Sequence, residues 1–129
     1  STQFRNRNLA ALYLDQGFLA GMGNYLRSEI LFFAGLHPDK KPAHLSDKQI
    51  KHLAAQTLQV TYRSYATGGY TRSIAASVCA RHSVAEYEAQ RFMVFDREGL
   101  LCRRCNETIL RAERSSRRIY FCPQCQGNE

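Results

Sequence analysis

Four cysteines near the carboxyl end of the chain constrain the possible folds more than any other feature. Cys102 and Cys105 form one C-x2-C pair and Cys122 and Cys125 form another, with sixteen residues between the pairs. Each pair can direct two thiolates at one point, and a hairpin between the pairs would bring the two points together, as tetrahedral Zn²⁺ requires. Two disulfides fit poorly in a chain without a visible secretion signal, and a redox motif needs only one pair. The spacing therefore predicts one structural zinc ion on the four sulfurs.

Helical patterning fills the first half of the chain. Apolar residues recur at partial helical spacing over residues 5–36, with an interruption at the glycines of the GMGN stretch and an end at Gly35. After a polar connector, residues 45–66 predict a longer helix that begins with a capping box, Ser46 with Gln49. The buried stripe of this helix is expected to consist of Ile50, Leu53, Ala54 and Leu58.

The second half of the chain changes character. Residues 67–90 carry two glycines, small residues and weak periodicity, which predicts a long connection with a short helix near 83–89. Residues 91–102 predict a strand, a turn at 97–99 and a second strand. Residues 106–122 predict a further hairpin, so helices are followed by a β-ribbon.

The chain is strongly basic. Its formal charge of +7 arises from 18 basic and 11 acidic residues, and 14 of the basic residues are arginines. Arginine suits phosphate because its planar fork binds two oxygens at once, although a solvated basic surface gives the same composition. Between residues 102 and 125, six arginines and two glutamates give +4, and four thiolates with one Zn²⁺ reduce this to about +2. We therefore expect the positive charge to act at the far end of the hairpin, on Arg114, Arg117 and Arg118 beside Ser115 and Ser116.

A glycine-rich turn is a second candidate for binding phosphate. Gly21 and Gly23 bracket Met22, and Asn24 stands where the next helix is expected to begin. Asn is a good N-cap, which is a sufficient structural reason for its presence. Glycines also leave backbone N–H groups uncovered at the positive end of a helix, where a phosphate binds well. Both explanations stay open on the spacing alone, because G-x-G is a weak motif.

These motifs carry a resemblance to a known family. The stretch LDQGFLAGMGNYLRSEIL resembles the helix–two-turn–helix of the formamidopyrimidine-DNA glycosylase and endonuclease VIII family, and residues 102–126 resemble the zinc finger that ends those enzymes. The NYLRSEIL and SSR segments are more similar to the endonuclease VIII branch, which acts on oxidised pyrimidines. The resemblance implies a mainly α fold with a C-terminal antiparallel β-hairpin zinc finger. It implies a helix–two-turn–helix DNA-binding domain at 1–90, which includes the 67–90 loop, and a zinc-finger β-ribbon at 91–129.

The resemblance also implies roles for single residues. Asn24 matches the family's turn asparagine, which holds a DNA phosphate beside the lesion, and its neighbours Gly23 and Tyr25 are expected to take part in DNA binding. Arg117, five residues before Cys122, matches the finger arginine that holds a phosphate beside the flipped nucleotide. The remaining DNA-binding residues expected are Arg118, in an auxiliary role, and Ser116.

In this family the chemistry belongs to an amino-terminal domain, where a proline amine forms a Schiff base and a glutamate acts as acid. No Pro-Glu start is present and the chain begins with Ser1, so we expect a piece of a longer protein without a catalytic residue of its own. Asp15 and Glu29 are expected to be surface or helix-turn carboxylates, and Cys79 a small thiol outside the zinc site. The implied function is DNA binding within a bifunctional base-excision-repair DNA glycosylase/AP lyase for oxidised bases, with this chain inactive alone.

Other kinds of protein share part of these features. A similar finger occurs at the tail of some isoleucyl-tRNA synthetases and helix–two-turn–helix units occur in a ribosomal protein, so a non-enzymatic zinc-ribbon module that binds nucleic acid is the main alternative. A zinc ribbon that binds protein is a further alternative, and it predicts no DNA affinity. We expect double-stranded DNA with damaged bases as the partner, a monomer, and a cytoplasmic location with nucleoid association during repair. No run of eighteen apolar residues occurs, which predicts no membrane span.

Overall fold

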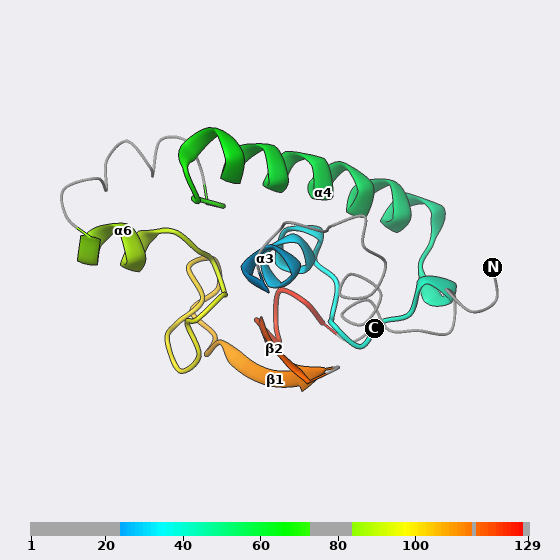
Figure 1. The fold of residues 1–129 in the computed structure, drawn as a ribbon. Coiled ribbons are helices and arrows are strands. Elements are labelled where there is room, and N and C mark those ends of the chain that lie inside the picture. Colours follow the sequence, from blue (N-terminus) through cyan, green and yellow to red (C-terminus); the bar gives the residue numbers. More distant parts are fainter. Residues whose placement is uncertain (1–23, 73–83, 115, 128–129) are drawn as a thin grey trace.

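The computed structural model describes residues 24–72, 84–114 and 116–127, which form helices followed by a two-stranded ribbon (Figure 1). The expected fold class, mainly α with a C-terminal antiparallel hairpin, is confirmed. The predicted helical residues 5–23 lie outside the described residues. The elements, in chain order, are α3 (Asn24–Ala34), the 3₁₀ helix η1 (Pro42–His44), α4 (Asp47–Thr67), α6 (Val84–Gln90), β1 (Leu110–Arg114) and β2 (Arg117–Phe121).

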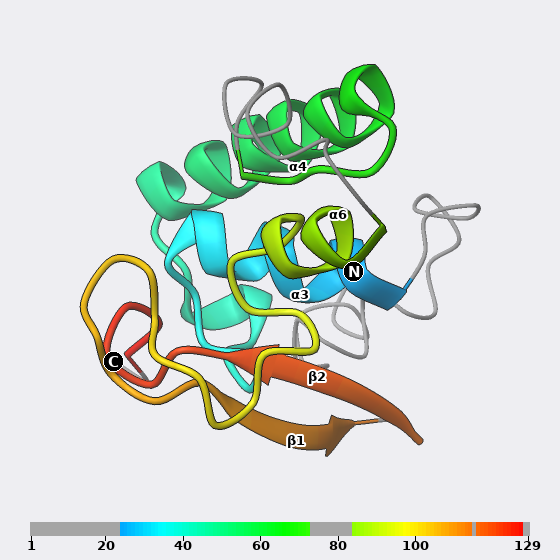
Figure 2. The same ribbon diagram turned by 90° about the vertical axis from the view of Figure 1, so that its left-hand side faces the viewer.

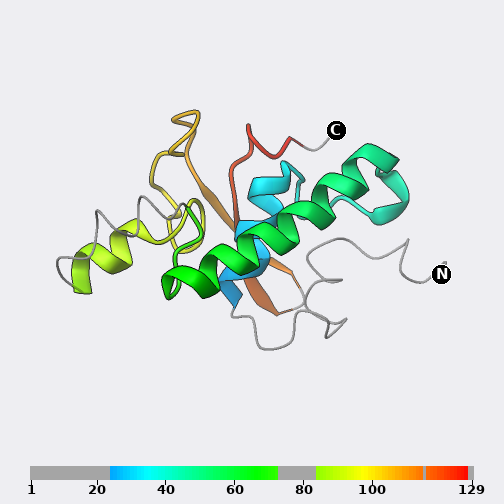
Figure 3. The same cartoon turned by 90° about the horizontal axis from the view of Figure 1, so that it is seen from above.

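Helix α3 lies between α4 and the β-ribbon (Figure 1), and α4 crosses over it in the view from above (Figure 3). One buried cluster joins α3 to α4 and β2, and its members are Leu26, Ile30, Leu31, Ala34, Leu36, Val60 and Ile119. A second cluster joins α3 to the cysteine-bearing segments, and its members are Phe32, Met93, Val94, Cys102, Ile109, Tyr120 and Cys122. The ribbon and the helices therefore share their core, and the division of the chain at residue 90 stays a prediction.

Helix α3 ends as the sequence predicts. Gly35 adopts φ 71°, a left-handed conformation that glycine reaches without a steric penalty. The amide of Gly35 donates to the carbonyl of Phe32 at 3.0 Å, and the amide of Leu36 donates to that of Leu31 at 3.0 Å. These bonds satisfy carbonyls in the last turn and direct the chain into the connector toward η1.

The predicted capping box of α4 is confirmed. The Gln49 amide donates to the Ser46 hydroxyl at 3.1 Å, and the Ser46 amide donates to the Gln49 side chain at 2.8 Å. The helix runs for 21 residues to Thr67, and the residue that caps it, Gly68, is left-handed with φ 72°. None of the helices in the described ranges is long and apolar enough to cross a lipid bilayer.

The predicted buried face of α4 is wrong at three of its four positions. Ile50 is 47% exposed and Leu58 is 74% exposed, and Ala54 is exposed as well. The residues of α4 that are buried against α3 and its surroundings are Val60, Ser64 and Thr67, with Leu53 partly buried. This face is polar where α4 meets the aromatic residues below it, since the Ser64 hydroxyl bonds to Tyr25. The apolar stripe therefore does not predict which face of α4 is buried, because the contact between α4 and α3 is made partly by hydrogen bonds.

The predicted terminal hairpin is confirmed. Strands β1 and β2 pair antiparallel, with Leu110 opposite Phe121 at one end and Arg114 opposite Arg117 at the other. Side chains alternate between the two faces of a ribbon, and Ile119, on the face toward α3, is fully buried. Figure 2 shows the tip of this hairpin and the amino end of α3 on the same side of the molecule.

The predicted strand at residues 91–95 is wrong, because this segment forms a turn instead. Its backbone N–H groups find a different acceptor: the Glu29 carboxylate takes the amides of Met93 at 2.8 Å, Val94 at 2.8 Å and Phe95 at 2.9 Å. The second strand predicted at 100–102 is reduced to one isolated bridge to Thr108. A buried carboxylate thus replaces the partner strand, and Glu29 is fully buried rather than at the surface as expected.

Candidate metal centre and nucleic-acid interface

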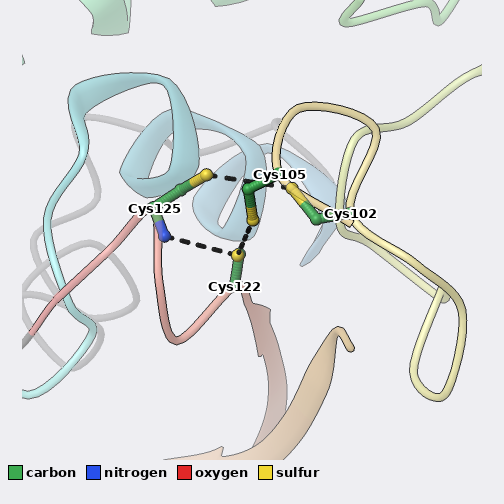
Figure 4. Close-up of side chains that lie close together, drawn as sticks. All are labelled: Cys102, Cys105, Cys122 and Cys125. Carbon is green, nitrogen blue, oxygen red and sulfur yellow. Dashed lines mark hydrogen bonds between the residues drawn. The ribbon is translucent and has the colours of Figure 1, made fainter. Parts of the chain in front are cut away.

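The four cysteines come together at the base of the ribbon (Figure 4). Their sulfur atoms all lie within 4.8 Å of one another, with Cys102 to Cys125 at 3.8 Å and Cys105 to Cys122 at 3.4 Å. None of these four cysteines forms a disulfide, and Cys102 and Cys122 are buried. The arrangement can hold one metal ion.

The donor set fits zinc by distance and by chemistry. Tetrahedral zinc with sulfur at about 2.3 Å requires neighbouring sulfurs about 3.8 Å apart, close to the observed separations. Backbone amides already point at two of the sulfurs: Arg104 N–H donates to Cys102 at 3.4 Å and Cys125 N–H donates to Cys122 at 3.3 Å. Burial raises the pKa of the Cys122 and Cys125 thiols. A bound cation would favour the thiolate form of these two residues.

Polar side chains of α3 fasten the ribbon in place. The Arg27 guanidinium donates to the carbonyl of Arg118, and the Tyr120 amide donates to the Ser28 hydroxyl at 3.0 Å. Arg27 is only 4% exposed, and its Nε and Nη1 atoms lack a hydrogen-bond partner among the described residues. Burial lowers the pKa of Arg27, and the nearby charge of Arg117 lowers it further. The helix therefore sets both the position of β2 and the positive potential at its start.

Two further links tie the metal-binding loops to the helical half. The Gln126 side chain accepts from the Cys122 amide at 2.9 Å and donates to the Leu36 carbonyl at 3.0 Å. Asp39, in the connector after α3, binds Arg114 with both oxygens, at 2.5 and 2.7 Å. This bond holds the pKa of Asp39 below its usual range. Arg114 is thus engaged by a carboxylate rather than presented at the tip.

The tip of the hairpin presents two arginines. Ser116 sits in the turn with φ 62°, and Arg117 and Arg118 follow it at the start of β2, all three exposed. They line a pocket of about 460 Å³ together with Phe95, Asp96 and Tyr120. The structure therefore brings three of the sequence-predicted residues to one surface, and it places a carboxylate beside them that the sequence analysis did not single out.

The amino end of α3 holds the other predicted residues. Asn24 is the first residue of α3, and Gly23 lies outside the described residues. The Tyr25 side chain points inward: its hydroxyl bonds to Ser64 at 2.7 Å and its ring packs on Phe92 at 5.0 Å between centroids. Tyr25 can therefore offer DNA its backbone, whereas its ring and hydroxyl support the interior. The amino end of α3 and the arginine tip face the same side (Figure 2).

Sequence reasoning missed Glu29 and Arg27 as organising residues. Both lie in α3 within a run of apolar residues, and helical spacing alone places part of such a run in solvent. Here α4 covers one side of α3 and the ribbon covers another, so polar residues of α3 are buried as well. A detectable signal was the sequence RSE itself, three polar residues between apolar stretches of a central helix.

Comparison with known families and curated proteins gives consistent matches. Residues 1–76 match the family model described as the formamidopyrimidine-DNA glycosylase H2TH domain. The proteins named Endonuclease 8 from Klebsiella pneumoniae and from Escherichia coli are each 44% identical to this chain over 126 residues. These matches cover 98% of this chain and 44% of each relative. The chain thus spans less than half the length of the curated relatives that it matches.

Solved structures show the same likeness at the level of the fold. The Lactococcus lactis Fpg in complex with DNA that contains an abasic site has a TM-score of 0.76 and 26% identity, covering 98% of this chain and 45% of that one. The MutM (Fpg) protein of Thermus thermophilus has a TM-score of 0.73 and 28% identity, covering 95% of this chain and 46% of that one. Both likenesses extend over the helices and the cysteine-bearing ribbon together.

Proposed function

Because the chain belongs to the formamidopyrimidine-DNA glycosylase H2TH family, we propose that it is the DNA-binding part of a base-excision-repair glycosylase/AP lyase. The matches at 44% identity to proteins named Endonuclease 8 support the branch that acts on oxidised pyrimidines. They extend over both the helices and the finger, which disfavours a tRNA-synthetase-tail or ribosomal module, since each of those supplies only one of the two.

One observation carries the DNA-binding proposal. The amino end of α3, with Asn24, and the hairpin tip, with Ser116, Arg117 and Arg118, lie on the same side of the molecule. A helix amino end offers backbone N–H groups and a positive dipole to a phosphate, and arginine offers a fork of donors. Two phosphate-binding elements on one rigid body can hold a duplex backbone at two points. In this proposal the backbone of Tyr25 also contributes to the first contact, as does Gly23, which precedes α3 in the sequence and lies outside the described residues.

The fixed spacing of these two points favours the extrusion of a base. Flipping a nucleotide out of the stack costs a few kcal/mol, and it is easiest where the backbone is already held on both sides of the damaged position. The backbone of Arg118 is bonded to Arg27, so the arginine tip cannot drift away from α3. We propose a damaged duplex as the ligand and a monomer as the binding species.

Zinc is the metal proposed for the four-cysteine site. Bound to Cys102, Cys105, Cys122 and Cys125, the ion would supply folding energy for the ribbon and no chemistry on the DNA. The protein residues do the rest: amides at two sulfurs orient the site, and the Gln126 bridge connects it to the end of α3. The metal thereby stiffens the hairpin that presents Arg117.

Catalysis belongs to the parent protein in this proposal. Among the described residues that line the pocket at the hairpin tip there is no lysine, and Asp96 is the one carboxylate. Borohydride trapping on an abasic duplex should give no covalent adduct with this chain. An adduct with this chain alone would show that one of its own amines can act.

A salt titration tests the DNA-binding proposal. Duplex binding should weaken steeply with salt, and Arg117→Ala should lower the slope of log affinity against log salt by about 0.9 for one lost phosphate contact. Arg111→Ala is the matched control, because Arg111 is an exposed arginine of β1 paired with Glu98 at 3.2 Å and lies outside the pocket at the tip. An equal loss of slope for both variants, or wild-type binding that ignores salt, would refute the proposed contact.

A further inference from the structure

A second function of the hairpin tip follows from the pocket beside it. This pocket, of about 460 Å³, lies between the turn at Phe95 and Asp96 and the start of β2. Phe95 and Asp96 also line a neighbouring pocket of about 320 Å³, whose other wall includes Arg97 and Leu100. Both volumes are in the range of sites that take small organic groups, about 300–1,000 Å³. The two residues therefore stand on a ridge between two cavities next to the proposed phosphate contact.

Phe95 ends a line of packed aromatic rings. Its ring lies 5.1 Å from that of Tyr120, 5.2 Å from that of Phe92 and 6.2 Å from that of Tyr25, all in edge-to-face arrangements. Phe92 and Tyr120 are buried, whereas Phe95 is only half-buried. The line runs from the residue after Asn24 to the strand that carries Arg117, so it spans the space between the two phosphate-binding elements. A partly exposed aromatic ring that is supported by its neighbours is a surface on which a nucleobase stacks.

Asp96 adds a hydrogen-bond acceptor to this surface. Its backbone is left-handed, with φ 58°, a conformation in which Asp and Asn are enriched among non-glycine residues. Its side chain is exposed and makes no ion pair or hydrogen bond with any residue that the structure describes, although Arg117 and Arg118 line the same pocket. An ionised carboxylate only accepts hydrogen bonds, and it repels phosphate. Its natural partner on DNA is an N–H group on the edge of a base.

The turn that carries both residues is held rigidly from behind. The buried Glu29 carboxylate accepts the amides of Met93, Val94 and Phe95, and the Val94 carbonyl accepts the Arg97 amide at 3.1 Å. The Arg97 guanidinium donates to the Met93 carbonyl at 2.7 Å. The ring and the carboxylate are therefore fixed before any ligand arrives, which lowers the entropic cost of binding.

We propose that Phe95 and Asp96 form a binding site for an unstacked nucleobase that carries an N–H donor on its pairing edge. The ring of Phe95 contacts the face of the base, the Asp96 carboxylate accepts its N–H, and Arg117 holds the adjoining phosphate. This inference rests on the proposed DNA binding and adds to it the chemical class of base that the chain selects. Asp96 is then a specificity-determining residue, since phosphate contacts alone carry no information about the base.

The test uses duplexes with a single bulged nucleotide, because an unpaired base is already available without the cost of flipping. Three duplexes differ at the bulge: thymine, which has an N–H at ring position 3; O4-methylthymine, which lacks it; and tetrahydrofuran, which has no base. Affinities of the chain for each are measured by fluorescence anisotropy at one salt concentration. We expect the thymine bulge to bind about fivefold more tightly than the O4-methylthymine bulge, the low end of discrimination by one base contact.

The variant Asp96→Gly should abolish this preference and leave affinity for the tetrahydrofuran bulge within about twofold, because glycine keeps the left-handed turn without the carboxylate. Glu98→Gln is the control: it removes a carboxylate two residues away that is paired with Arg111 and lines neither pocket, so the preference should persist. A uniform rise in affinity with Asp96→Gly would show that the carboxylate only repels phosphate and would overturn the site. Equal wild-type affinity for the two base-containing bulges would overturn it as well. Failure of the proposed function would look different, as salt-independent or absent binding to all three duplexes.

Discussion

Replacing Glu29 tests whether one buried carboxylate organises the turn beneath the proposed interface. Its two oxygens accept hydrogen bonds from three consecutive backbone amides, those of Met93, Val94 and Phe95, and from the Thr71 hydroxyl. The side chain is 0% exposed, so water cannot replace a lost acceptor without disturbing the core. Glu29→Gln keeps the shape of the side chain and removes the charge and one acceptor atom.

The magnitude follows from which donors lose their partner. The new carboxamide can be oriented in two ways. In the first, its NH₂ group replaces Oε2, which accepts the amides of Val94 and Phe95. In the second, the NH₂ group replaces Oε1, which accepts the Met93 amide and the Thr71 hydroxyl. The second orientation is the cheaper, because the Thr71 hydroxyl can turn, and it leaves one buried amide unsatisfied. An unsatisfied buried donor costs about 1–3 kcal/mol, so with the lost charge we expect Glu29→Gln to destabilise the chain by about 2–3 kcal/mol. Glu29→Ala, which abandons every bond, should cost about 3–5 kcal/mol.

The free energy of unfolding of both variants is measured by urea denaturation with zinc in excess. Far-ultraviolet circular dichroism monitors the unfolding. Glu107→Gln is the matched control, because Glu107 is an exposed carboxylate whose side chain makes no hydrogen bond or ion pair within the described residues, and its cost should be within about 0.5 kcal/mol of zero. The reasoning is refuted if Glu29→Gln is as stable as the control. The contribution of Glu29 to the free energy of unfolding would then come from packing around its side chain and not from its hydrogen bonds.

Two further predictions concern the metal and the connector. Metal analysis should find one zinc ion per chain. Chelation should reduce the protection of backbone amides from hydrogen exchange in α3 as well as in the ribbon, because Phe32 packs in the same cluster as Cys102 and Cys122. A metal-free, disulfide-bonded protein whose amides are fully protected would contradict this prediction. The Asp39–Arg114 bond lowers the folded-state pKa of Asp39, so its contribution to stability is present above the unfolded pKa of about 3.9 and is lost as pH falls through the folded value. The gap in unfolding free energy between wild type and Asp39→Asn should therefore be constant near neutral pH and close below about pH 4, and a gap that widened in acid would reverse the assignment.

Local patterns in the sequence predicted the features that depend on neighbouring residues. The capping box at Ser46, the glycine end of α3 and the spacing of the cysteines involve only a few consecutive positions each, and the structure has all of them. The helix–ribbon order follows for the same reason. The roles of Asn24 and Arg117 in DNA binding came from family resemblance and stay predictions.

Features that depend on distant partners were not predictable in this way. Residues 91–95 contain a run of apolar residues that is typical of a strand, but the competing acceptor, Glu29, lies 64 positions away from Met93. The exposed face of α4 was misjudged because Leu58 is more apolar than Ser64, while only Ser64 faces a side chain it can bond, that of Tyr25. Hydrophobic periodicity reports the average environment of a helix face, and it cannot report a specific hydrogen bond that reverses it.

The three consecutive polar residues of α3 also bear on how the chain is made. The partner of Arg27 lies 91 positions later in the chain, and that of Ser28 lies 92 positions later. The partners of Glu29 lie 42 and 64 to 66 positions later. At a synthesis rate of about 5–20 residues per second, α3 emerges several seconds before the partners of its polar groups exist. During that interval the helix cannot bury this face without leaving a guanidinium and a carboxylate unsatisfied, which favours its staying exposed to water. A nascent chain that stopped short of β2 would carry this unfinished helix permanently, and such a product is a natural substrate for proteolysis.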